Sequence, residues 1–86
     1  MPEICRFLGI IITMHYKDHA PPHFHAKYGE LRGAFTIADL RLVEGFLPRR
    51  VVLLVLEWAF EHRDELLADW ELAMAQKPLH KVPPLV

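Results

Sequence analysis

Four of the six histidines in this 86-residue sequence lie within eleven consecutive positions, as His15, His19, His23 and His25. Imidazole titrates near neutral pH, so grouped histidines can exchange protons with a substrate. Neutral imidazole nitrogens also bind divalent metals. We take all four as candidate catalytic residues. The spacing of His19, His23 and His25 also allows a metal site, and a polar, solvated sheet face would show the same pattern.

Alternating side chains predict that these histidines lie on two neighbouring strands. From Phe7 to Lys17 the residues at even positions form an apolar face, and the opposite face includes His15 and Lys17. A loop over 18–22 follows, marked by two prolines. Alternation resumes from His23 to Tyr28, with His23 and His25 on the polar face. The strands would therefore present their histidines on one side of a sheet.

The pair Gly29-Glu30 predicts a tight turn that sets the register of the next strand. Glycine at the first central position is what a type II′ hairpin turn requires. The turn pairs apolar residues on one face: Tyr28 with Leu31, Ala26 with Gly33, and Phe24 with Phe35. By the same reasoning, a five-residue loop before His23 would place His15 directly across from His25, with Cβ atoms about 5 Å apart. Lys17 would then face His23, and all of these side chains would point away from the helix.

The second half of the chain is predicted to be mainly helical. A short strand over Leu42–Gly45 follows a turn around Asp39, and Pro48 suits the first position of a helix. Neither proline nor glycine interrupts the chain from there to about Gln76. One helical stripe is apolar, comprising Val51, Val52, Val55, Ala59, Leu66, Leu67, Trp70 and Met74. His62 falls within this stripe, which favours a hydrogen-bonded core histidine, and a helix break near 62–64 is expected.

We therefore predict a single α+β domain over 1–86. It has a small antiparallel sheet of three to four strands within 4–46, packed on one long or broken C-terminal helix over 48–76. The tail over 77–86 is extended. Leu53, Leu54 and Trp58 lie at the rim of the apolar stripe or beyond it. We expect them to be covered by this tail or by a second copy of the chain, which would form a homodimer through the apolar start of the helix.

Five basic residues are candidate phosphate ligands. Lys17, Lys27 and Arg32 fall on the open face of the hairpin, while Arg49 and Arg50 occupy the first helical turn, where free amides attract anions. The net charge of −1 argues against a uniformly basic surface for nucleic acid. A local basic patch is compatible with that charge. The single cysteine, Cys5, excludes an intramolecular disulfide and favours a cytoplasmic location. The sequence contains no run of eighteen apolar residues, so it predicts no membrane span.

Several blocks resemble domain-of-unknown-function family 4160 (DUF4160), a family of small bacterial proteins. They are the opening 1–12, the histidine-proline block 18–26, the junction 44–49, the stretch 57–63 and the final 70–73. Ala20 departs from relatives that commonly have asparagine there. The resemblance implies a genomic partner of domain-of-unknown-function family 2442 (DUF2442) and a toxin–antitoxin module with this chain as toxin. It carries over no catalytic residues.

From the residues and the resemblance together, we expect a toxin component that acts on or binds RNA through the open sheet face. The four histidines would supply acid–base groups, and the five basic residues would bind phosphates. No cofactor is required in this hypothesis. One alternative is a hydrolase in which His19, His23 and His25 hold zinc or manganese. Another is a non-catalytic module that only binds its protein partner, so enzymatic activity stays an open question at this point.

Overall fold

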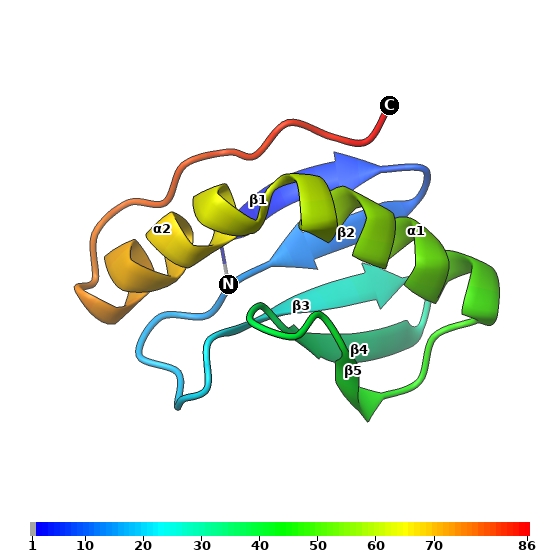
Figure 1. Ribbon diagram of the computed structural model, residues 1–86, viewed down its shortest axis with the longest axis horizontal. Helices are drawn as coiled ribbons and strands as arrows, with labels where there is room; N and C mark the ends of the chain where they lie inside the picture. Colours follow the sequence, from blue (N-terminus) through cyan, green and yellow to red (C-terminus); the bar gives the residue numbers. More distant parts are fainter. Residues whose placement is uncertain (1) are drawn as a thin grey trace.

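The computed structural model describes residues 2–86 and shows an α+β fold (Figure 1). Five antiparallel strands follow one another in sequence order across a single sheet. They are β1 (Glu3–Phe7), β2 (Ile10–Thr13), β3 (His23–Tyr28), β4 (Leu31–Thr36) and β5 (Leu42–Gly45). Two helices, α1 (Arg49–Glu61) and α2 (Arg63–Met74), lie across one face of the sheet. Within residues 2–86, no helix covers the opposite face of the sheet.

The predicted number of three to four strands was too low, because the segment from Phe7 to Lys17 is not one strand. The chain turns at Leu8 and Gly9, whose φ angles are +48° and +79°. This turn folds β1 back onto β2, with Phe7 paired to Ile10. Leucine rarely adopts a left-handed conformation, so the apolar run across it looked continuous in the sequence. The strand also ends earlier than predicted, at Thr13.

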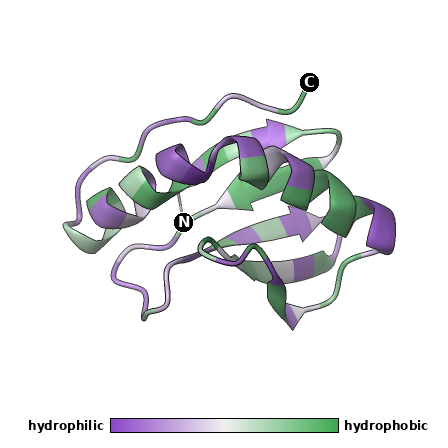
Figure 2. Cartoon of the chain, in the orientation of Figure 1, coloured by the Kyte–Doolittle hydropathy of each residue, from purple (hydrophilic) through white to green (hydrophobic). Residues whose placement is uncertain are grey.

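The predicted β3–β4 hairpin is confirmed residue by residue. Tyr28 pairs with Leu31, Ala26 with Gly33, and Phe24 with Phe35. Gly29 has a φ angle of +61° while Glu30 does not adopt a positive one, as a type II′ turn requires. Hydrophobic and hydrophilic residues alternate along these strands (Figure 2). The turn and the alternation therefore favour the same register.

The helical region divides where a break was expected. His62, with φ −122° and ψ 25°, ends α1 and precedes α2. Its ring is largely buried at 5.7 Å from the Trp58 ring, and its Nδ1 lies 2.5 Å from Oε1 of Glu65. His62 is therefore hydrogen-bonded, as predicted, but lies at the edge of the core beside Trp58 rather than within the core. Pro48 is the N-cap residue, so the helix begins one position later than predicted. Neither helix is long and apolar enough to cross a membrane, within residues 2–86.

The C-terminal tail covers part of the apolar helix surface, as predicted. Trp58 is fully buried, packs against Phe7 and edge-to-face against Phe24, and donates a hydrogen bond from Nε1 to the Pro83 carbonyl at 2.8 Å. The Val82 amide donates a hydrogen bond to the Ile4 carbonyl, and the tail lies beside β1 (Figure 1). Leu54 is half-buried. The tail does not cover Leu53, which is 55% exposed, so its burial by a second subunit stays a prediction.

Candidate functional site

The carboxylate of Asp18 lies at the centre of the four clustered histidines. Its Oδ2 atom is 2.9 Å from Nε2 of His23, 3.5 Å from Nε2 of His25 and 3.8 Å from Nδ1 of His15. Its Oδ1 atom accepts a hydrogen bond from the His19 amide at 2.8 Å and lies 3.0 Å from Nδ1 of the same residue. One mostly buried carboxylate therefore gathers the histidines into a single group.

The loop over 14–22, between β2 and β3, brings Asp18 to this position. The chain turns at Lys17, which adopts a left-handed φ of +56°, and Asp18 follows it directly. Ionised carboxylates accept hydrogen bonds readily from nearby backbone amides, and Asp18 does so from the next residue. The short loop predicted between the strands is therefore longer in the structure. This length is what lets Asp18 reach back to the histidines of β3.

The predicted pairing of His15 with His25 was wrong by two residues, although the two side chains do meet. The partner of His25 on β2 is Thr13, and His15 lies beyond the end of that strand. A register shift of two residues leaves His15 on the same face of the sheet as His25. The centroids of the two rings are 3.9 Å apart and the interplanar angle is 7°, so the rings stack. Lys17, in the turn, does not face His23 as predicted.

His23 is held more tightly than an open-face residue would be. Its Nδ1 lies 2.8 Å from the Pro21 carbonyl and its Nε2 lies 2.9 Å from the Asp18 carboxylate. Each ring nitrogen of His23 therefore already has a protein partner. The side chain is only 9% exposed, and its ring lies 5.2 Å from that of Trp70 on α2. His23 therefore connects the cluster to the core and has no free nitrogen for a substrate.

His15 and His25, in contrast, each keep an accessible ring edge. Their side chains are about one-third exposed, and both border a depression of about 120 Å³. Burial, with a smaller effect of the neighbouring His25, lowers the pKa of His15 below its ordinary value of 6.5. Burial alone would raise the pKa of Asp18, but the His19 amide and the charges and hydrogen bonds of His23 and His25 bring it below 3.8. A neutral His15 therefore faces the depression beside an ionised Asp18.

Two of the five predicted phosphate ligands border the same depression. Lys27 and Arg32 are exposed, directly paired across β3 and β4, and line it together with His15 and His25. Neither forms a salt bridge within residues 2–86. Like charges directly opposite on a sheet repel each other, and an anion between them would relieve that repulsion.

The remaining predicted phosphate ligands lie elsewhere. Arg49 and Arg50 are exposed in the first turn of α1, at the end of the sheet opposite the β2–β3 loop (Figure 1). Lys17 is exposed in the turn before Asp18 and lines neither this depression nor its neighbours. The site therefore gathers two of the basic residues and leaves three outside.

The set of side chains that could hold a metal differs from the predicted one. Ligand atoms of His15, Asp18 and His25 lie within 4.8 Å of one another, and this is the one such group within residues 2–86. His25 belongs to both sets, whereas His19 and His23 do not belong to this group. The rings of His15 and His25 are parallel and 3.9 Å apart, so at least one of them would have to turn for both to bind one ion. The same side chains can therefore exchange protons or, after such a rotation, hold a metal.

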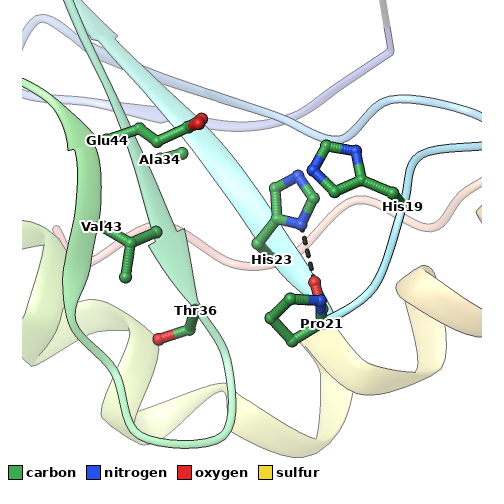
Figure 3. Close-up of a pocket in the computed structure, with 7 residues that line it drawn as sticks. All are labelled: His19, Pro21, His23, Ala34, Thr36, Val43 and Glu44. Carbon is green, nitrogen blue, oxygen red and sulfur yellow. Dashed lines mark hydrogen bonds between the residues drawn. The ribbon is translucent and has the colours of Figure 1, made fainter.

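A second, larger hollow lies on the other side of His23. Its volume is about 350 Å³, and it is lined by His19, Pro21, His23, Ala34, Thr36, Val43 and Glu44. Figure 3 shows the rings of His19 and His23 on one side, and Glu44 extending over Ala34 toward them. This hollow joins the β2–β3 loop to β5, two elements far apart in the sequence.

The sequence prediction missed two residues of this surface, Asp18 and Glu44. Asp18 falls in the predicted loop over 18–22 and was not taken as a site residue, although an ionisable carboxylate beside four histidines was a usable indication of a charge centre. Glu44 could not be placed, because its strand was predicted without a register. The structure pairs Glu44 with Ala34 on β4, next to the histidine strand.

Comparison with known proteins identifies the family. The family model for a domain of unknown function, DUF4160, matches residues 9–71. That span covers well over half of the chain and includes the histidine loop, the sheet from β2 to β5, α1 and most of α2. The chain therefore belongs to the DUF4160 family. No curated protein and no solved structure matches it.

Proposed function

We propose that this DUF4160 protein is the toxin component of a bacterial toxin–antitoxin module and acts on RNA at the open face of its sheet. The observation that carries the proposal is the stacked pair His15 and His25, with free ring edges beside Lys27 and Arg32. Two cations and two proton-exchanging groups around one depression match a phosphodiester and its reacting oxygens. The protein antitoxin, of the DUF2442 type, follows from the family resemblance.

The chemistry that suits these groups is transesterification within the RNA strand. His15, neutral because its pKa is lowered, takes the proton of a ribose 2′-hydroxyl as that oxygen attacks the adjacent phosphorus. The bond from phosphorus to the 5′-oxygen breaks, and that oxygen takes a proton from His25. A cyclic phosphate and a free 5′-hydroxyl result. Lys27 and Arg32 neutralise the phosphate, and Asp18 orients the His25 ring through its Nε2 atom.

Binding of a fluorescently labelled single-stranded RNA, measured by anisotropy at several salt concentrations, tests the electrostatic part. Replacing Lys27 and Arg32 by alanine should weaken binding and lower the salt slope by about 0.7 for each lost contact. Replacing Arg49 and Arg50 by alanine is the matched control, because it also removes two positive charges, at the far end of the sheet. Equal losses in both variants would show that the depression is not the binding site.

Induced expression in bacteria tests the chemical part. The wild-type chain alone should arrest growth, and co-expression with its genomic neighbour should restore growth. His25→Ala should abolish the arrest while the protein still accumulates in folded form. A growth arrest that survives this change would contradict the assigned role of His25.

Metal analysis separates acid–base chemistry from the metal-dependent hydrolase. We expect the purified protein to cleave RNA after dialysis against a chelator. Stoichiometric zinc or manganese, together with loss of cleavage on chelation, would instead assign the group His15, Asp18 and His25 to a metal. Binding of the antitoxin without any effect on RNA would leave a partner-binding module.

A further inference from the structure

The hollow between the β2–β3 loop and β5 has no part in the proton transfers described above. Its volume of about 350 Å³ lies within the range of about 300–1,000 Å³ that small-molecule sites occupy. The small side chain of Ala34 forms the floor of the hollow, and Pro21 and Val43 form its apolar walls. The rings of His19 and His23 lie on one side (Figure 3). Flat apolar walls with aromatic rings are suited to a planar ring system.

Glu44 determines the polarity of this hollow. It is exposed, lies across from Ala34 on β4 and extends over that residue toward the histidines (Figure 3). No salt bridge of Glu44 occurs in the part of the chain that the structure describes. A free carboxylate repels phosphate but accepts hydrogen bonds from N–H groups. The hollow therefore suits a ligand that is planar and rich in N–H donors.

The hollow is continuous with the phosphate-binding side of the face. A third depression, lined by His25, Arg32, Gly33, Ala34, Glu44 and Gly45, shares Ala34 and Glu44 with the hollow. It shares His25 and Arg32 with the depression where we place the phosphodiester. A nucleotide with its phosphate near Arg32 can therefore extend its base over Ala34 toward His19.

We infer that this hollow binds a guanine base of the RNA and that the Glu44 carboxylate selects it. Guanine presents two adjacent donors, N1–H and the 2-amino group, which match the two oxygens of a carboxylate. Adenine and cytosine place an acceptor beside their amino group, and uracil flanks its single N–H with carbonyls that a carboxylate repels. The inference rests on the proposed function, because it names the base next to the phosphodiester that His15 and His25 act on.

Binding of short labelled oligouridylates that differ at one central position tests this inference. An oligonucleotide with central guanosine should bind about tenfold more tightly than those with adenosine, cytidine or uridine. Inosine, which keeps N1–H and lacks the 2-amino group, should fall between them. Glu44→Gln should remove the preference, so that strands with any of the four central bases bind with similar affinity. Glu30→Gln, an exposed carboxylate at the far hairpin turn, is the matched control and should keep the preference.

The outcomes distinguish the inference from the function on which it rests. Equal affinity for all central bases, with binding that still depends on Lys27 and Arg32, would overturn the guanine site and leave the RNA-binding proposal intact. A guanine preference that survives Glu44→Gln would overturn the role of Glu44. Absence of binding to every oligonucleotide would overturn both. Cleavage products that end at guanosine in the wild-type protein, but at any base in Glu44→Gln, would support both.

Discussion

Replacing Asp18 by asparagine is the most informative single change in this protein. The substitution keeps the size of the side chain and removes its charge. The new amide can still accept the hydrogen bond of the His19 backbone N–H, which lies 2.8 Å from Oδ1. Its nitrogen then faces Nε2 of His23, 2.9 Å away, where the wild-type carboxylate accepts a hydrogen bond. One charge-assisted hydrogen bond is therefore lost, and only a weaker contact between neutral groups replaces it.

The expected cost at neutral pH follows from that bond. A hydrogen bond to a charged group contributes about 1.5–3 kcal/mol, and Asp18 is only 15% exposed, so solvent screens it little. We expect the free energy of unfolding to fall by about 2 kcal/mol. In a domain of this size about 1 kcal/mol corresponds to about 4–8 °C in Tm, so Tm should fall by about 8–16 °C. The stack of His15 on His25 should also loosen, because Asp18 lies beside both rings.

The pH dependence of this loss tests its electrostatic origin. The pKa of Asp18 is lower in the folded protein than its ordinary value of 3.8. Its contribution to stability is therefore fully present above about pH 3.8 and is lost as pH falls through the folded pKa. Thermal unfolding of both proteins, followed by circular dichroism, should give Tm values that differ most at neutral pH and converge in acid.

Two results would refute this reasoning. A Tm difference that stays constant down to pH about 3 would mean that packing, and not the charge, holds the loop. No difference at neutral pH would mean that the histidines keep their positions without the carboxylate. Asp64→Asn is the control, because this exposed aspartate in the first turn of α2 should contribute only a few tenths of a kcal/mol.

Three further changes test other parts of the structure. Gly45→Ala should destabilise the protein strongly in urea unfolding, because Gly45 has a φ of +82° and the new Cβ would lie 2.2 Å from the Arg32 carbonyl oxygen. Gly29→Ala, whose Cβ meets open space, should lower the free energy of unfolding by only about 1 kcal/mol. His62→Ala should lower the free energy of unfolding by about 1–2 kcal/mol, and an unchanged value would contradict its core role. Asp69 is buried, and burial raises its pKa above 3.8. Its favourable contribution to folding stability is therefore present in acid and is lost as pH rises through the folded pKa. The Tm of Asp69→Asn relative to wild type should therefore rise with pH, opposite in sign to Asp18→Asn, and a flat profile would contradict this.

Local patterns were sufficient to predict the β3–β4 hairpin and the helix break. Gly29 supplies a conformation that few other residues adopt, and the alternation on both sides of it admits one register. At 62–64 the helical pattern continues without proline, but its length exceeds what a small sheet can cover. The information for the hairpin therefore lies within a few neighbouring residues, and the information for the helix break lies in the length of the uninterrupted helical pattern.

The features that the sequence did not reveal depend on contacts between distant residues. Leu8 adopts a left-handed φ that its side chain does not favour, and the pairing of β1 with β2 holds it there. The loop after β2 was predicted too short because Met14 continues the apolar alternation, although the strand has already ended. The two-residue error in register followed from this. This error still left His15 on the predicted face of the sheet, because side chains along a strand return to the same face every two residues.

The candidate site and the fold share some residues and not others, and this decides which variants can test function. His23 packs near Trp70, and Asp18 holds His23, so a change at either residue disturbs the core together with the cluster. His25 and Lys27 lie on the open face and border the depression without a role in the core. Under the proposed function, a loss of growth arrest in Asp18→Asn would therefore have two explanations, unfolding and lost chemistry. The same loss in His25→Ala or Lys27→Ala, with Tm close to that of the wild type, has one.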